Sequence, residues 1–282
     1  MGSGDMRYGF VLPFCHPRRV ADAALAAERA GWDGVYVWET IWGWEAWVSL
    51  AAAATVTERI RLGTMLTPLS RRKPWELASQ ALSVDHLSGG RLTLSVGLGA
   101  VDTGFAAFGE ETDRRRRAEL LDEGLDIVTG LWAGQPFRYD GTHYHVRPTD
   151  FLTPPPTVQQ PRIPIWVVGA WRREKSMARV LRYDGILPNV FDPDGRAKEA
   201  GLADVRALTR WVAERRPPEA GPFEVVVEGE TPAGDPQAAA DTVRPWAEAG
   251  ATWWIEGMWG AQGKPDEVDR VTGRLLAGPP RS

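Results

Sequence analysis

The residues of this chain that are best suited to proton transfer are two glutamates and one histidine. Glu39 and Glu256 each end a run rich in β-branched and aromatic residues, and His16 follows a third apolar run. A carboxyl or imidazole group whose pKa is tuned by burial can act as a general acid or base. Glu39, His16 and Glu256 are therefore the candidate acid–base residues.

An apolar run at residues 163–169 leads into a basic segment that is suited to binding an anion. The run ends at Gly169, and Ala170, Trp171, Arg172 and Arg173 follow. This order predicts a strand, a tight turn and a helix start, where free backbone N–H groups carry partial positive charge. A glycine there permits close approach of a phosphate, and the arginines add full charges. An ordinary turn with solvated arginines explains the same stretch equally well.

Metal chemistry is the main alternative for the carboxylates, because a barrel hydrolase or lyase can hold Mg²⁺ at its strand ends. The carboxylates near expected strand ends are Glu39, Glu228, Glu230 and Glu256. Cys15 and His16 are adjacent on an extended segment, so their side chains point to opposite sides and do not form a dyad. His143 and His145 share one face of a hairpin but lack further nearby ligands. We expect no metal site.

The chain has 14 tryptophans, an unusual number. An indole offers a large apolar face and one hydrogen-bond donor, so tryptophans beside a strand end can wall a pocket for an apolar or aromatic molecule. Packing in the hydrophobic core explains other tryptophans of the chain. The expected substrate pocket consists of Trp38, Thr40, Trp42, Trp44 and Trp259.

Regular alternation of strands and helices must position these groups. Apolar runs that suit strands alternate eight times with segments of helical spacing. The expected strands are residues 7–12, 34–38, 60–66, 92–96, 163–169, 185–187, 223–227 and 252–256. The expected helices are residues 20–30, 45–55, 74–87, 114–132, 174–182, 205–215, 236–249 and 266–276. This order predicts a (β/α)8 TIM barrel, with a doubly wound open sheet as the alternative.

An insertion interrupts the alternation between the fourth helix and the fifth strand. Residues 137–146 alternate around Asp140-Gly141, which predicts a hairpin, and a proline-rich connector follows. We therefore expect a single barrel domain at residues 6–282 with an insertion at about 134–161. Residues 1–5 are expected to be an artificial leader ahead of a natural start at Met6.

Bulk composition favours small-molecule chemistry. The formal net charge of -4 and a pI near 5.7 give no reason to expect a nucleic-acid or membrane partner. The single cysteine cannot form an intramolecular disulfide, and no long uncharged apolar run could span a bilayer. We expect a cytoplasmic protein with a small-molecule substrate.

Four passages give the chain a resemblance to the bacterial luciferase-like superfamily of flavin- and coenzyme F420-dependent oxidoreductases. They are residues 30–39, residues 59–64, residues 87–99, and residues 121–132 with the hairpin that follows. The resemblance covers nearly the whole length, and it implies a barrel with a dissociable cofactor, FMN or F420, over its mouth. It also implies a homodimer packed through the second and third helices, with residues 51–54 at the interface. A separate flavin or F420 reductase is a further possible partner.

The resemblance also implies a set of cofactor-binding residues. Thr64 and Met65 align with a bulge that backs the deazaflavin ring in some F420-using relatives. Gly97 and Gly99 match a loop that lets backbone approach the cofactor, although a tight turn needs the same glycines. The phosphate would lie at the turn formed by Gly169, Ala170, Trp171, Arg172 and Arg173.

One position departs from the family pattern. Many relatives have a histidine directly after the acidic residue that ends the second strand, and here the pair is Glu39-Thr40. Threonine does not titrate near neutral pH, so any acid–base work falls to Glu39, His16 or Glu256. The missing histidine favours FMN and two-component monooxygenation over F420 and hydride transfer. It also leaves open a barrel that binds a flavin without turnover.

Overall fold

The computed structural model describes residues 6–151, 153–192, 194, 196–198, 200–261 and 267–281. The expected leader at residues 1–5 and the expected start of the last helix at Asp266 lie outside this part of the chain.

Eight parallel strands close into a barrel. They are β1 (Arg7–Val11), β2 (Gly34–Val37), β3 (Arg61–Thr64), β5 (Leu92–Gly97), β8 (Ile165–Ala170), β9 (Gly185–Phe191), β11 (Glu224–Gly229) and β12 (Trp253–Glu256). Each strand pairs with the next in this order, and β12 pairs with β1 to complete the ring. This closure confirms the predicted (β/α)8 barrel and excludes the open sheet.

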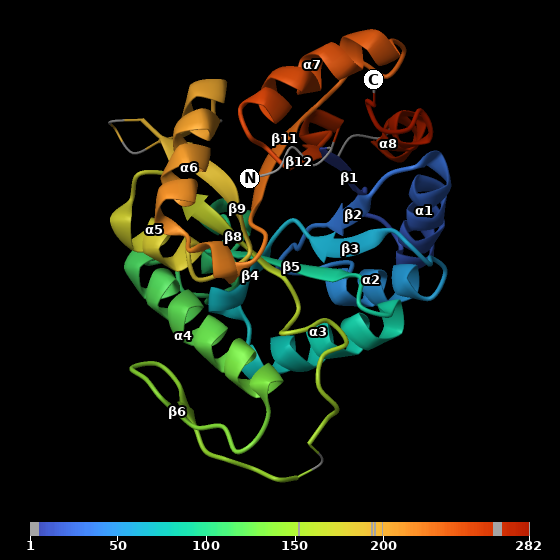
Figure 1. Cartoon of the computed structure of the whole chain (residues 1–282). Coiled ribbons are helices and arrows are strands. Elements are labelled where there is room, and N and C mark those ends of the chain that lie inside the picture. Colours follow the sequence, from blue (N-terminus) through green and yellow to red (C-terminus); the bar gives the residue numbers. More distant parts are fainter. Residues whose placement is uncertain are drawn as a thin grey trace.

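Helices surround the ring of strands, as Figure 1 shows. They are α1 (Pro17–Ala30), α2 (Ala46–Ala54), α3 (Pro74–Ser88), α4 (Arg114–Ala133), α5 (Glu174–Val180), α6 (Leu202–Arg215), α7 (Pro236–Glu248) and α8 (Glu267–Leu276). Several begin with proline, and α1 and α3 end at the left-handed glycines Gly31 and Gly89. Proline at the start of a helix and glycine at its end are the boundary signals on which the helix predictions depended.

Large aromatic side chains fill the barrel interior. Tyr36 stacks on Trp166 with ring centroids 5.6 Å apart, and Trp253 meets Trp166 edge to face with ring centroids 5.4 Å apart. Glycines on neighbouring strands make room for them, because a Cβ atom at Gly9 or Gly63 would lie 2.6 or 2.9 Å from the Tyr36 ring. The interior is therefore a packed core and not a pore.

The insertion after α4 is a short hairpin, β6 (Tyr139–Asp140) and β7 (His145–Val146), that extends away from the barrel (Figure 1). Asp140 pairs with His145, so the turn consists of residues 141–144 and not of Asp140-Gly141 as predicted. Glu123 on α4 fastens this turn by accepting backbone hydrogen bonds from residues 142–144.

Two short strands extend the sheet near the mouth of the barrel. They are β4 (Thr67–Pro68), parallel to β5, and β10 (Ala197–Lys198), antiparallel to the end of β9. Short 3-10 helices lie in the connections, at Leu69–Arg71, Val101–Thr103, Ala106–Phe108, Pro218–Ala220 and Trp259–Ala261.

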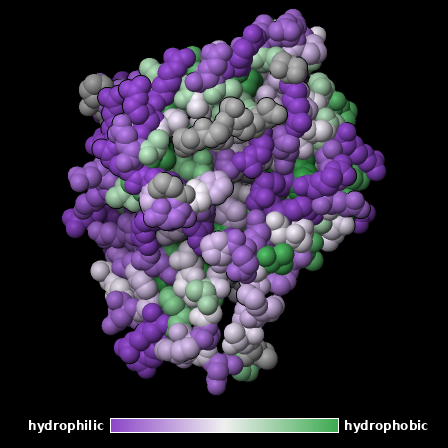
Figure 2. Space-filling view, in the orientation of Figure 1, coloured by the Kyte–Doolittle hydropathy of each residue, from purple (hydrophilic) through white to green (hydrophobic). Residues whose placement is uncertain are grey.

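The face of the molecule seen in Figure 2 is mostly hydrophilic, and its hydrophobic side chains form scattered groups. Within the described ranges, no helix has the length and apolar character needed to cross a membrane.

Candidate active site at the barrel mouth

A cavity of about 610 Å³ lies at the mouth, where the carboxyl ends of five barrel strands meet. Residues from β8, β9 and β11 line it, together with the segments that follow β3 and β12. A second cavity of about 620 Å³ lies outside the barrel wall, between α5 and α6. Reaction sites of this architecture lie at the carboxyl ends of the strands, so the mouth cavity is the candidate active site.

The floor of the mouth cavity is apolar. Met65, Leu187 and Val226 line it and also pack on the aromatic interior of the barrel. The peptide bond between Met65 and Leu66 is cis, and both residues line the cavity. The packed interior below the floor offers a rigid apolar platform on which a flat ring system can lie.

Charged and polar groups stand at the rim. Lys198 enters from β10, Asn189 from β9, and Glu228 and Glu230 from the end of β11 and the residue beyond it. Trp259 Nε1 donates a hydrogen bond to Glu228 Oε2 over 2.9 Å. In the part of the chain that the structure describes, no three histidine, cysteine or acidic residues form a group able to hold a metal ion.

Aromatic side chains form a wall beside the cavity. The ring centroid of Trp38 lies 6.3 Å from that of Trp259, in an edge-to-face arrangement, and 5.1 Å from that of Phe14. The Trp38 Nε1 atom is buried and has no hydrogen-bond partner among the described residues. Trp42 and Trp44 lie farther out, 80% and 45% exposed. Of the predicted pocket tryptophans, the structure therefore brings Trp38 and Trp259 together.

Glu39 is at the mouth but is enclosed by donors. Its side chain is 1% exposed. Trp47 Nε1 (3.0 Å) and Thr67 Oγ1 (2.7 Å) donate to Oε1, whereas Arg71 Nη2 (3.3 Å) and Arg72 Nη2 (2.8 Å) donate to Oε2. Every lone-pair direction of this carboxylate has a partner, so Glu39 ties the end of β2 to the segment after β3.

The two arginines bound to Glu39 respond differently to burial. For Arg71, burial lowers the pKa and outweighs the attraction of Glu39. For Arg72, burial also tends to lower the pKa, but attraction and hydrogen bonding from Glu39 and Glu45 prevail and raise it. Glu45 contacts Arg72 at 2.8 Å and also caps the N-terminus of α2.

The other acid–base candidates have structural partners as well. Glu256 is 0% exposed and accepts hydrogen bonds from Thr231 N (2.6 Å) and Oγ1 (2.8 Å), with Arg274 Nη2 at 3.4 Å. His16 is exposed at the start of α1, where Nδ1 accepts from the Arg18 backbone, and its ring lies 5.0 Å from Trp44. The Thr40 hydroxyl donates to the Trp42 carbonyl oxygen over 2.9 Å.

The glycine loop after β5 is fixed by hydrogen bonds from Arg117 on α4. Arg117 on α4 is 6% exposed and donates to the carbonyl oxygens of Leu98 (2.8 Å) and Gly99 (3.0 Å). A Cβ atom at Gly97 would lie 2.9 Å from Leu66, a residue of the cavity lining, and Gly99 has a φ of 73°. Thr64 is fully buried under the loop, and its hydroxyl donates to the Ser95 carbonyl oxygen.

The backbone of the turn after β8 is largely occupied by the fold. Ala170 N donates to Ser176 Oγ (2.9 Å), Trp171 N to the Asn189 carbonyl oxygen (2.8 Å), and Arg173 N to the Ala170 carbonyl oxygen (3.0 Å). A Cβ atom at Gly169 would lie 2.7 Å from Ile186 on β9 and from Val180 on α5, so this glycine permits close packing of β8 against both elements.

The two arginines of the turn after β8 lie at different sites. Arg173 lies over the Phe191 ring at 6.0 Å, and Arg114 at the start of α4 lies over the same ring at 5.3 Å. Arg172 has a φ of 69° and lines the outer cavity between α5 and α6. The structure therefore places Arg173 and Arg114 over the same ring at the end of β9, whereas Arg172 lines the outer cavity.

Sequence reasoning ended the sixth barrel strand too early and did not assign Arg114 to the site. The predicted strand ended at residue 187, but β9 continues to Phe191, so Pro188 and Asn189 reach the cavity. Arg114 belongs to a run of four arginines that is typical of a solvated face. Within that run Arg115 and Arg116 do pair with Glu119 and Glu111, whereas Arg117 is buried.

Comparisons with known proteins agree with this architecture. The sequence matches the model of a family described as luciferase-like monooxygenase over residues 6–276. An uncharacterized protein of Mycobacterium tuberculosis is 33% identical over 215 residues, 76% of this chain and 69% of that protein. A putative coenzyme F420-dependent oxidoreductase of the same species is 37% identical over 131 residues, 46% of this chain and 37% of that protein.

A solved structure is similar in fold. The oxygenating constituent of 3,6-diketocamphane monooxygenase from Pseudomonas putida, in complex with FMN, superposes with a TM-score of 0.63 at 18% identity. The match covers 84% of this chain and 71% of that one.

Proposed function

Since the chain belongs to the luciferase-like monooxygenase family and is an F420- or flavin-dependent oxidoreductase, we propose that it uses coenzyme F420 for hydride transfer at the barrel mouth. The substrate we propose is a small apolar or aromatic molecule.

The observation that carries the proposal is the mouth cavity, whose parts fit a flat ring with an anionic side chain. Its 610 Å³ volume lies within the usual ~300–1,000 Å³ of small-molecule sites. The apolar floor of Met65, Leu187 and Val226 suits a tricyclic ring. Arg114 and Arg173 lie outside the cavity lining, over the ring of Phe191 at the end of β9, and would hold the phosphate beyond the cavity.

One consideration favours F420 over FMN. The relative named for F420 resembles this chain in sequence, whereas the FMN-binding monooxygenase resembles it in fold, and a shared fold does not identify a cofactor. Thr40, which replaces the family histidine, is the sequence feature that favours FMN, although hydride transfer itself does not require that histidine. FMN is the second candidate, and it would make the reaction a monooxygenation with reduced flavin supplied by a separate reductase.

When bound, F420 supplies or accepts the hydride, and the protein positions the reactants. Trp38 and Trp259 would press an apolar substrate against the ring and exclude water. The buried Trp38 Nε1, which lacks a partner among the described residues, can donate a hydrogen bond to a substrate oxygen. Glu228 and Glu230 are the carboxylates that line the cavity, so we assign them the exchange of the substrate proton.

A titration tests cofactor choice and phosphate site together. F420 and FMN are each added to the protein while tryptophan fluorescence is followed. Arg173→Ala and Arg114→Ala should each weaken binding by at least about tenfold, since a charge-assisted hydrogen bond contributes about 1.5–3 kcal/mol. Arg172→Ala is the matched control, because that side chain lines the outer cavity, and its affinity should equal that of the wild type.

The results separate the hypotheses. Tighter binding of FMN, followed by oxygen uptake with reduced flavin, would assign the monooxygenase reaction. Tight binding of F420 without turnover of any alcohol or carbonyl compound would favour a barrel that only binds the cofactor. Failure to bind either cofactor would refute the proposed function.

A further inference from the structure

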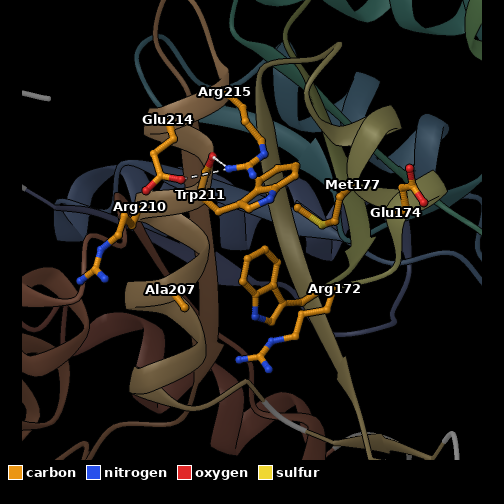
Figure 3. Close-up of a pocket in the computed structure, with 9 residues that line it drawn as sticks. Arg172, Glu174, Met177, Ala207, Arg210, Trp211, Glu214 and Arg215 are labelled. Carbon is orange, nitrogen blue, oxygen red and sulfur yellow. Dashed lines mark hydrogen bonds and ion pairs between the residues drawn. The ribbon is translucent and has the colours of Figure 1, made fainter.

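The cavity between α5 and α6, called here the α5–α6 pocket, has no part in the proposed reaction. It has a volume of about 620 Å³, almost equal to that of the mouth cavity. Its lining consists of Trp171, Arg172, Glu174, Met177, Ala207, Arg210, Trp211, Glu214 and Arg215 (Figure 3). Residues of the seven-residue helix α5 and of α6 form its two sides.

The base of the α5–α6 pocket is aromatic. Trp171 and Trp211 meet edge to face, with ring centroids 5.9 Å apart and an interplanar angle of 80°. Met177 on α5 points toward Trp211 in Figure 3, and Ala207 lines the α6 side of the pocket. Two indole surfaces with a thioether beside them suit a planar apolar ring.

The arginines of the pocket have different partners. Arg215 is held in place, because Nη1 donates to Glu214 Oε2 over 3.1 Å and its guanidinium lies 4.8 Å from the Trp211 ring. Arg172 and Arg210 have no hydrogen bond or ion pair with any residue in the described ranges. In Figure 3 the Arg172 and Arg210 side chains lie on either side of Ala207, with Arg210 directed away from Trp211, whereas the Glu174 carboxylate points away from the pocket. That end of the pocket therefore carries two unpaired positive charges.

The buried N–H group of Trp171 gives independent support for a ligand in the α5–α6 pocket. Trp171 is 8% exposed, and its Nε1 atom is enclosed without a hydrogen-bond partner among the described residues. A buried indole N–H without an acceptor costs free energy. An acceptor supplied by a ligand in the pocket would remove that cost.

We propose that the α5–α6 pocket is a second ligand site, for a planar aromatic molecule that carries a carboxylate. The ring would lie against Trp171 and Trp211, and Arg172 and Arg210 would bind the carboxylate from opposite walls. The site is separate from the mouth, because the left-handed conformation of Arg172 directs its side chain away from Arg173 and Phe191.

Calorimetric titration of the full chain with 2-naphthoate tests the charge requirement. The uncharged 2-naphthalenemethanol, which has the same ring, is the matched ligand. We expect one binding site for 2-naphthoate and at least tenfold weaker binding of the alcohol. Equal affinity for the two ligands, or no binding of 2-naphthoate, would overturn the proposal.

Variants locate the site. Arg172→Gln and Arg210→Gln should each weaken 2-naphthoate binding about tenfold, and Trp211→Ala should weaken it further. Arg206→Gln, an exposed arginine on α6 outside the pocket lining, should leave the affinity unchanged. Loss of binding in Trp38→Ala together with full binding in Arg210→Gln would place the ligand at the mouth and refute the second site. F420 should bind Arg210→Gln as it binds the wild type, so the two proposals fail independently.

Discussion

Arg172 and Arg173 are adjacent in the chain, yet their side chains reach different cavities. Arg173 shares the Phe191 ring with Arg114, and Arg172 lines the α5–α6 pocket. A positive φ is uncommon for a residue with a Cβ atom and costs roughly 1 kcal/mol. In the sequence the two arginines look like one anion site, and the backbone at Arg172 separates them.

Glu39, a candidate acid–base residue, gives a prediction at the residue scale, because its carboxylate is buried among four donors. We expect Glu39→Gln to lower the free energy of unfolding by about 3 kcal/mol, because breaking a buried ion pair leaves uncompensated charge on Arg71 and Arg72. Urea unfolding followed by circular dichroism measures this change. Glu58→Gln, at an exposed glutamate, should stay within about 0.5 kcal/mol of the wild type.

A purely catalytic Glu39 would give a different result. Loss of turnover with an unchanged unfolding midpoint would show that the carboxylate acts on the substrate and that its ties to Arg71 and Arg72 contribute little to stability.

At the scale of elements, glycines on the strands leave space for the aromatic side chains of neighbouring strands. Gly63→Ala should lower the free energy of unfolding by about 2–3 kcal/mol, because its Cβ atom would lie 2.7 Å from the Thr93 carbonyl oxygen and 2.9 Å from Tyr36. Thermal unfolding measures the effect. Gly273→Ala is the control, since nothing lies within 4 Å of its Cβ position on α8 and alanine favours a helix.

Helix α1 is tied to the segment before β3 by one carboxylate. Glu28 accepts hydrogen bonds from the backbone N–H groups of Glu58, Arg59 and Ile60 at 3.0, 2.6 and 2.8 Å. Burial tends to raise the pKa of Glu28, but these hydrogen bonds prevail, and its pKa lies below the ordinary value of 4.5.

The direction of this shift determines the pH dependence of stability. A carboxyl group whose pKa is lower in the folded state contributes stability above its unfolded pKa. That contribution is lost as the pH falls from about 4.5 through the lower folded pKa. Urea unfolding from pH 7 to pH 3 should therefore show a constant difference between wild type and Glu28→Gln above pH 5, shrinking in acid. A difference independent of pH would contradict this assignment.

At the scale of the whole molecule, we expect a homodimer that uses the outer face of α2. Ala53 and Ala54 are buried inside the chain, so only Ala51 and Ala52 of the predicted alanine run, with the 57% exposed Val48, remain available to a partner. Sedimentation equilibrium should give twice the mass of the 31.1 kDa chain, and Val48→Arg should give the monomer. A wild-type monomer at all concentrations would refute the dimer.

The sequence by itself determined the order of elements and the barrel, because helix and strand periodicities and their glycine and proline boundaries are local properties. It also identified the mouth segments that contain Trp38, Met65 and Trp259. The family resemblance narrowed the cofactor to F420 or FMN.

Only the tertiary structure decided which groups meet. Glu39 finds partners on the segment after the next strand, and Arg114 and Arg173 both lie over the ring of Phe191. Arg172 lines a pocket that no sequence pattern indicated. The physical reason is that burial and partner choice depend on side-chain directions and on contacts between segments far apart in the chain. Residue types and their spacing do not specify these contacts.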